Sequence, residues 1–173
     1  LSKYVTKWNA LRDKQLRHLY SYLKSTADIK LHGSVDSLDI DNVVLHAYPD
    51  ADLCCTFDTT RATSGGFVEL IGAGTFFPSD LFSKRQSATS HSTTEAELVA
   101  ASKMLRESLI PIQLLWSLLL QRKVVSVVHE DNMSTITVID AGYSPQLRHI
   151  QKHHRISLCE VHELCQHDDI VLE

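Results

Sequence analysis

The chain has 173 residues, of which 43% are hydrophobic, and its formal net charge is -4 at pH 7. This length and composition indicate one globular domain with a sizeable core and room for a short appendage. The acidic balance excludes a generally basic surface, so any contact with nucleic acid has to come from a local basic patch. No apolar run approaches the roughly 18 residues of a membrane span, so we expect no transmembrane helix and no membrane partner.

The N-terminus and the cysteines bear on whether the chain is part of a longer protein and whether it is reduced. The sequence begins Leu1-Ser2-Lys3-Tyr4, without an initiator Met or a signal-peptide pattern, so we expect a fragment of a longer protein. The cysteines Cys54, Cys55, Cys159 and Cys165 lack the density of a disulfide scaffold. We therefore expect a reduced, intracellular chain.

The first part of the chain is predicted to be a helical appendage. Apolar residues from Trp8 to Leu23 recur at spacings that favour a helix within residues 1–31, followed by a short extended exit. Residues 32–37 are polar and rich in turn formers. We therefore expect an appendage at 1–37 and the main domain at 38–173.

Three strands joined by tight turns are predicted next. An apolar stretch over residues 43–57 favours a first strand, whose end delivers Asp50. Residues 63–66 include two glycines and indicate a turn. Strands over 67–71 and 75–83 follow. Their close succession predicts an antiparallel meander.

Helices and strands alternate in the rest of the domain. A long helix is predicted to begin after a cap at Ser92, Thr93 or Thr94, to bury a stripe from Leu98 to Ile112, and to kink or restart at Pro111. The resulting α/β architecture is a mixed five-stranded sheet, antiparallel at first and parallel afterwards, flanked by helices. The remaining predicted elements are a buried strand at 124–129, a helix at 133–139, an amphipathic helix at 147–164 and a final strand at 169–173.

Three carboxylates occupy corresponding places in this order of elements. Asp50 lies at the end of the first strand, Glu97 at the start of the central helix and Asp131 just after the fourth strand. If they converge, they repel one another unless cations lie between them. Oxygen ligands suit Mg²⁺ or Mn²⁺, and two such ions can activate water against a phosphodiester. For Glu97 alone, a favourable interaction with the helix dipole is the simpler explanation.

Six short motifs follow one another along the chain, each of them weak alone and specific as a series. They are Tyr48-Pro49-Asp50-Ala51-Asp52, Arg61-Ala62-Thr63-Ser64-Gly65-Gly66, Ser83-Lys84-Arg85-Gln86, Ser92-Thr93-Thr94-Glu95-Ala96-Glu97-Leu98-Val99-Ala100, Glu130-Asp131-Asn132 and Arg148-His149-Ile150. On these motifs the chain resembles the ribonuclease H domain of a copia-type long-terminal-repeat retrotransposon polyprotein. Residues 9–31 resemble the tail of the reverse transcriptase's connecting segment.

The resemblance implies a ribonuclease H-like fold and a specific activity. The expected enzyme is an endoribonuclease that cleaves the RNA strand of RNA/DNA hybrids with two Mg²⁺ or Mn²⁺ ions. The resemblance implies that Asp50 bridges both ions and that Glu97 and Asp131 each hold one. The implied partner is the reverse transcriptase portion of the same polyprotein, within retroelement particles in the cytoplasm.

Two further places are candidates for contact with the substrate. Lys84 and Arg85 precede the central helix and can meet substrate phosphates, with a solvated loop as the alternative. Asn132 either bonds the RNA backbone or caps the helix that follows it. The acidic net charge predicts that hybrid binding by the isolated chain is weak and salt-sensitive.

The sequence departs from the family pattern at the fourth metal-binding residue. The family has a fourth carboxylate on a helix after the last strand, whereas this sequence ends at Glu173, within that predicted strand. Either the sequence is truncated, or a histidine such as His154 replaces the carboxylate, with a core-facing histidine as the alternative. Two other functions therefore stay open. They are another ribonuclease H-fold nuclease or strand transferase, and a catalytically degenerate structural domain of a polymerase polyprotein.

Overall fold

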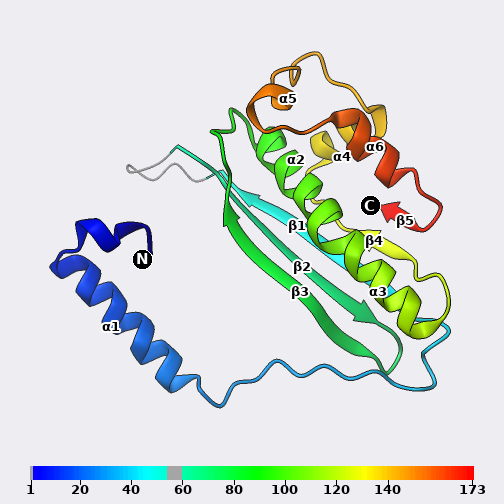
Figure 1. Cartoon of the computed structure of the whole chain (residues 1–173), viewed down its shortest axis with the longest axis horizontal. Helices are drawn as coiled ribbons and strands as arrows, with labels where there is room; N and C mark the ends of the chain where they lie inside the picture. Colours follow the sequence, from blue (N-terminus) through cyan, green and yellow to red (C-terminus); the bar gives the residue numbers. More distant parts are fainter. Residues whose placement is uncertain (1, 54–59) are drawn as a thin grey trace. The chain divides into compact units, whose positions relative to one another are not determined.

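The computed structural model describes residues 2–53 and 60–173, so Cys54, Cys55 and the end of the predicted first strand lie outside the described part. The chain divides into two compact units, Leu1–His32 and Gly33–Glu173 (Figure 1). This division precedes the predicted boundary at residue 37, because Ser34 and Phe76 exchange backbone hydrogen bonds of 2.8 and 3.0 Å. No helix among the described residues is long and apolar enough to cross a membrane.

The first unit is helical. A 3-10 helix, η1, covers Ser2–Lys7, and the helix α1 covers Ala10–Ser25. Asn9 begins α1 because its side chain accepts a hydrogen bond from the Arg12 N–H at 3.1 Å. The predicted helix is therefore confirmed. Its origin as a tail of a reverse transcriptase stays a prediction.

The second unit is built on a mixed five-stranded sheet in the order β3-β2-β1-β4-β5. The pairs β1–β2 and β2–β3 are antiparallel, whereas β4 runs parallel to both β1 and β5. This topology confirms the predicted ribonuclease H-like sheet. The strands are β1 Val44–Asp52, β2 Thr63–Ile71, β3 Phe76–Arg85, β4 Ser126–Val128 and β5 Ile170–Leu172.

The predicted turn at 63–66 is wrong, because these residues are the first part of β2. The glycine pair serves a different purpose from a turn. A Cβ placed on Gly66 would meet the Phe82 ring at 2.5 Å and the methyl group of Met104. Gly66 therefore allows side chains of β3 and of the central helix to pack directly against the strand backbone.

A long helical segment crosses one face of the sheet (Figure 1). It consists of α2 Thr93–Lys103, a π-helical turn η2 Met104–Leu109, and α3 Ile110–Leu120. Ser92 is the cap, since its side chain accepts a hydrogen bond from the Glu95 N–H at 3.1 Å. The predicted stripe is confirmed, because the side chains of Leu98, Ala101, Leu105 and Leu109 are buried and Ile112 packs against them.

The predicted restart at Pro111 is confirmed, because the α-helix α3 begins at Ile110 with Pro111 in its first turn. The turn before it is π-helical, and the Ile110 N–H donates to the carbonyl of Leu105, five residues earlier. A π-helical turn of this kind absorbs the loss of a backbone donor at proline. The segment therefore continues across the sheet, with α-helical geometry resumed from Ile110 onward.

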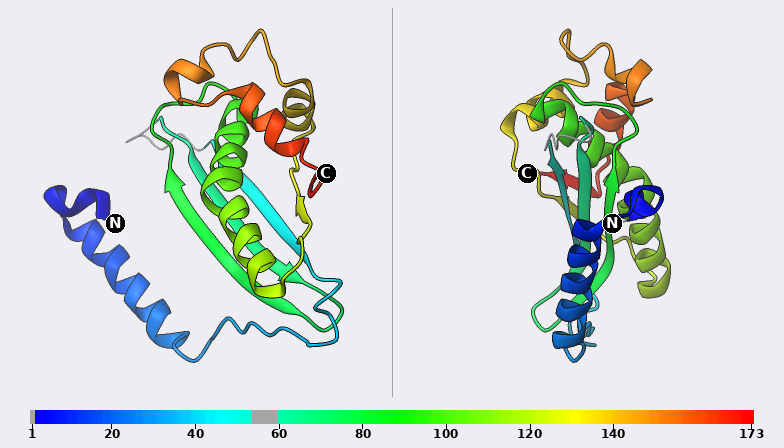
Figure 2. Two further views of the ribbon diagram at one scale, coloured as in Figure 1. Left: turned by 45° about the vertical axis from the view of Figure 1, so that its right-hand side comes forward. Right: turned by 90° about the vertical axis from the view of Figure 1, so that its left-hand side faces the viewer.

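The predicted single helix at 147–164 is wrong. The structure has two short helices, α5 Ile150–His153 and α6 Leu158–Cys165 (Figure 2). Arg155 separates them, with a positive φ of 59° that a helix does not allow. The remaining helix, α4, covers Met133–Ala141 and confirms the prediction.

Candidate active site

Two of the three predicted carboxylates are brought together by the pairing of β1 with β4. These strands are parallel, with Ala47 opposite Val128, and the His129 N–H donates to the Ala47 carbonyl at 2.9 Å. Asp50 and Asp131 lie the same number of residues beyond this pair, and both are exposed. The register therefore places them at the same edge of the sheet, as predicted.

Glu97 comes to the same edge from α2. Its carboxylate accepts a hydrogen bond from the Ala51 N–H of β1, and only 7% of the residue is exposed. Burial, followed by the negative charges of Asp50 and Asp131, raises the pKa of Glu97 to about 7. One carboxylate oxygen, Oε2, is buried without a hydrogen-bond partner. The three predicted residues therefore share one electrostatic environment.

A fourth carboxylate, Glu130, belongs to this group and was not predicted. It is 5% exposed, and its Oε1 accepts a hydrogen bond from the Asn132 N–H at 3.3 Å. Burial raises its pKa to about 7, with further contributions from Glu97, Asp131 and Asp50. Its Oε2 has no partner. Strand alternation was the available signal, since the buried Val128 is two residues earlier.

We call these four residues, Asp50, Glu97, Glu130 and Asp131, the acidic cluster. A hollow of about 500 Å³ lies at this edge of the sheet. Its wall is ordered by His129, whose Nδ1 lies 3.1 Å from Glu173 Oε1 and whose ring stacks on Tyr48 with centroids 4.7 Å apart. The hollow is lined by Tyr48, Pro49, Asp50, His129, Glu130, Asp131 and Glu173.

The chemistry of the acidic cluster fits a cation. Burial and the neighbouring negative charges raise the pKa values of Glu97 and Glu130, and each of these two carboxylates has a buried oxygen without a partner, so the cluster needs either protons or positive charge. Among residues 2–53 and 60–173, however, no three His, Cys, Asp or Glu side chains are arranged as a metal-binding group. The cluster therefore has suitable donors without a complete set of ligand positions.

The predicted substrate residues lie in two other places. Lys84 and Arg85 are the last residues of β3 rather than part of a loop, and they line a separate hollow. Asn132 caps α4, because its side chain accepts hydrogen bonds from the N–H groups of Ser134 and Thr135 at 3.0 and 3.3 Å. This capping role is the alternative that the sequence left open.

His154 belongs to a histidine network around Glu95. The Glu95 carboxylate is fully buried, with Oε1 3.1 Å from His149 Nε2 and 3.3 Å from His154 Nε2. Its Oε2 accepts the His91 N–H at 2.7 Å. Burial acts to raise the pKa of Glu95, but these hydrogen bonds hold it below its usual value. His154 thus contacts Glu95, Ser90 and the backbone of Thr89, none of them a predicted ligand.

No family model matches the chain. Among solved structures, LC11-RNase H1 isolated from compost by a metagenomic approach has a TM-score of 0.48 and 13% identity, covering 75% of this chain and 82% of that one. RNase H1 from the halophilic archaeon Halobacterium salinarum NRC-1 has a TM-score of 0.44 and 13% identity over 75% and 83%. A foamy viral protease-reverse transcriptase in complex with dsDNA has a TM-score of 0.43 and 11% identity over 76% and 79%.

Proposed function

We propose that this chain is a metal-dependent endonuclease that hydrolyses the RNA strand of RNA/DNA hybrids. The acidic cluster carries the proposal, because three separate elements bring four carboxylates together, two of them with a buried oxygen that lacks a partner. Oxygen-only ligation suits Mg²⁺ or Mn²⁺. Two such ions would activate a water and stabilise the leaving oxygen of a phosphodiester.

Each member of the cluster has a distinct position for this work. Asp50 and Asp131 are exposed at the hollow and would hold the metal ions there. Glu97 would hold one ion from α2, where the Ala51 N–H orients its carboxylate. Glu130 supplies a fourth carboxylate from the end of β4. It removes the need for His154 in that role.

The choice of substrate and setting depends on the sequence motifs. The resemblance that they carry, to the ribonuclease H domain of a retrotransposon polyprotein, supports an RNA/DNA hybrid as the substrate, rather than duplex RNA or duplex DNA. The same resemblance supports the reverse transcriptase portion of one polyprotein as the partner. It also supports a retroelement particle inside the cell as the location.

A gel assay with labelled substrates tests the proposal. RNA/DNA hybrid, duplex RNA and duplex DNA are incubated with Mg²⁺ or Mn²⁺, using the natural chain, Asp50→Asn and Asp41→Asn. Asp41 is an exposed aspartate in a turn before β1 and serves as the matched control. We expect RNA cleavage in the hybrid alone, lost in Asp50→Asn and kept in Asp41→Asn. Cleavage or strand transfer on duplex DNA would instead support another nuclease of this fold.

A second candidate is a catalytically degenerate domain that serves to pack against a polymerase. It is favoured by the lack of a ready-made metal-binding group among the described residues. Melting curves with and without Mg²⁺ separate the two functions, because an ion bound to the acidic cluster stabilises the folded state. A Mg²⁺-dependent rise in melting temperature that Asp50→Asn reduces supports the nuclease. An unchanged melting temperature together with no cleavage supports the degenerate domain.

A further inference from the structure

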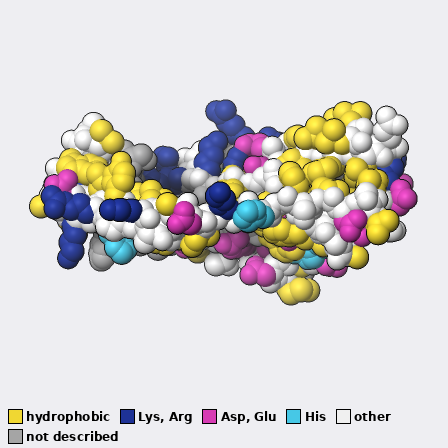
Figure 3. All heavy atoms as spheres, turned by 90° about the horizontal axis from the view of Figure 1, so that it is seen from below, with side chains coloured by type: hydrophobic (Ala, Val, Ile, Leu, Met, Phe, Trp, Pro, Cys, Tyr) yellow, Lys and Arg dark blue, Asp and Glu magenta, His cyan; other side chains and the backbone are white. Residues whose placement is uncertain are grey.

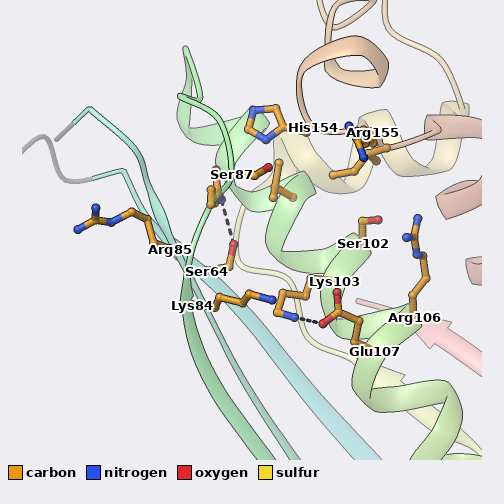
Figure 4. Close-up of a pocket in the computed structure, with 13 residues that line it drawn as sticks. Ser64, Lys84, Arg85, Ser87, Ser102, Lys103, Arg106, Glu107, His154 and Arg155 are labelled. Carbon is orange, nitrogen blue, oxygen red and sulfur yellow. Dashed lines mark hydrogen bonds and ion pairs between the residues drawn. The ribbon is translucent and has the colours of Figure 1, made fainter. Parts of the chain in front are cut away.

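A second hollow, of about 300 Å³, lies between the end of β3, the α2–η2 helix and the loop before α6. Figure 4 shows basic side chains from these three segments beside it, with Lys84 directed toward Lys103 and Arg85 directed away from the others. On the face that Figure 3 shows, Lys and Arg side chains lie in groups rather than evenly spread. We call this hollow the basic pocket; its cations are Lys84, Arg85, Lys103, Arg106 and Arg155.

The charge of the basic pocket opposes that of the chain as a whole. Its one lining carboxylate is Glu107, which pairs with Lys103. Arg106 pairs with Glu160, outside the lining, at 3.4 Å. Among the described residues, no ion pair within 4 Å is formed by Lys84, Arg85 or Arg155. The pocket is therefore strongly positive in a chain whose net charge is -4.

The wall of the pocket is held by a buried side chain. Gln86 is 4% exposed, and its Nε2 donates to Ser64 Oγ at 3.0 Å and to the Ala96 carbonyl at 2.9 Å. Its Oε1 accepts from Ser90 Oγ at 2.6 Å. These bonds join β2, β3 and α2 beside the cations. Lys84 and Arg85 therefore project from a fixed strand end.

Arg155 is presented to the pocket by an uncommon backbone conformation. Its φ of 59° lies in the left-handed region, which non-glycine residues seldom adopt. The side chains on either side, His154 and Ile156, are both buried, so the loop is held from two directions. Arg155 itself stays exposed and lines the pocket. Arg155 thus has a disfavoured backbone conformation at a position where its side chain contributes a fifth cation to the basic pocket.

We propose that the basic pocket binds the phosphodiester backbone of a nucleic-acid strand. Besides Lys103 and Arg106, which are in ion pairs, the pocket has Lys84, Arg85 and Arg155, and this is more charge than one small phosphate needs, which favours a polyanion. Lys103 lies on the side of α2 away from Glu97, given about 100° of rotation per residue, and six residues further along the helix. A helix width of about 10 Å and an axial rise of about 9 Å place the pocket about 13 Å from Glu97. At about 3.4 Å of axial rise per nucleotide, this spans about four nucleotides of one strand.

The identity of the ligand rests on the proposed function, but its binding can be measured without cleavage. Fluorescence anisotropy of a labelled RNA/DNA hybrid is followed in EDTA over a range of salt concentrations. The variants are Lys84→Gln/Arg85→Gln and Arg155→Gln. The matched control is Lys123→Gln, an exposed lysine that follows α3 and does not line the pocket. Lys84→Arg/Arg85→Lys keeps the charge.

Each lost phosphate contact lowers the slope of log affinity against log salt by about 0.9. We expect a fall of about 2 for the Lys84→Gln/Arg85→Gln variant and about 1 for Arg155→Gln, with wild-type slopes for Lys123→Gln and Lys84→Arg/Arg85→Lys. Equal slopes and affinities for all proteins would refute the proposal that the basic pocket binds nucleic acid. The absence of hybrid binding by the natural chain would refute it as well. If the slopes change but no protein cleaves hybrid with Mg²⁺ or Mn²⁺, the nuclease proposal fails and the pocket stands. Melting curves confirm that the variants fold.

Discussion

Replacing Glu130 by Gln is predicted to stabilise the metal-free protein at pH 8. The carboxylate has an ordinary pKa of 4.5, and in the folded chain burial, followed by the charge of Glu97, raises it to about 7. A buried carboxylate of this kind binds its proton more tightly in the folded state than in the unfolded state. The free energy of unfolding therefore falls as the pH rises from about 4.5 through 7.

The magnitude follows from the size of the pKa change. About 2.5 units at 1.36 kcal/mol each correspond to about 3 kcal/mol lost above pH 7. The amide of Gln avoids this loss, but its nitrogen takes the place of the unpartnered Oε2, at a cost of about 1 kcal/mol. The net gain is about 2 kcal/mol. For a chain of this size it raises the melting temperature by about 4–8 °C.

The assay is a series of melting curves in EDTA from pH 5 to pH 8 for the natural chain and the Glu130→Gln variant. Glu163→Gln, at an exposed carboxylate on α6, is the control. We expect Glu130→Gln to gain stability over the natural chain only as the pH rises, and Mg²⁺ at pH 8 to reduce the difference. The electrostatic reasoning is refuted if Glu130→Gln changes the melting temperature equally at every pH.

Three further substitutions test how the site is built. Gly66→Ala would force its Cβ against Met104 and Phe82, so we expect urea unfolding to show a loss of about 1–3 kcal/mol; an unchanged midpoint would contradict this close packing. Ser92→Ala removes the cap of α2 and should lower the free energy of unfolding by about 1 kcal/mol in the same assay, whereas Ser92→Thr keeps a capping hydroxyl and should retain most of this stability. Glu95→Gln weakens the hydrogen bonds from two histidines, and we expect a loss of about 2 kcal/mol. Equal stability of the Gln variant would show that the charge of this carboxylate is dispensable.

The arrangement of strands could be predicted because the sequence signals for it are local. The β-branched run before Asp131 and the closely spaced apolar stretches around Asp50 specify strands, and the order of elements specifies a mixed sheet. Convergence of the three carboxylates then follows from topology. Glu130 was missed because it stands among polar residues after a strand, where the sequence favours a turn. Its burial depends on the Glu173 carbonyl, which accepts its N–H at 2.8 Å.

Other errors have the same origin in distant contacts. Two adjacent glycines usually indicate a turn, but Gly66 is required by Phe82 and Met104, which pack against it from other elements. Apolar spacing predicted one helix through Arg155, yet burial of His154 and Ile156 on either side imposes a reversal there. Local periodicity contains no information about either contact.

The two faces of α2 explain how an acidic chain could hold a nucleic acid. Without cations, the exposed carboxylates of Asp50 and Asp131 would repel phosphates, so the proposed binding at the acidic cluster would depend on metal. The proposed binding at the basic pocket would not, because Lys84 and Arg85 supply the positive side chains there. Hybrid affinity should therefore have one part that EDTA removes and another that only salt removes. One helix would then fix the spacing between the two, since Glu97 and Lys103 belong to the same rigid element.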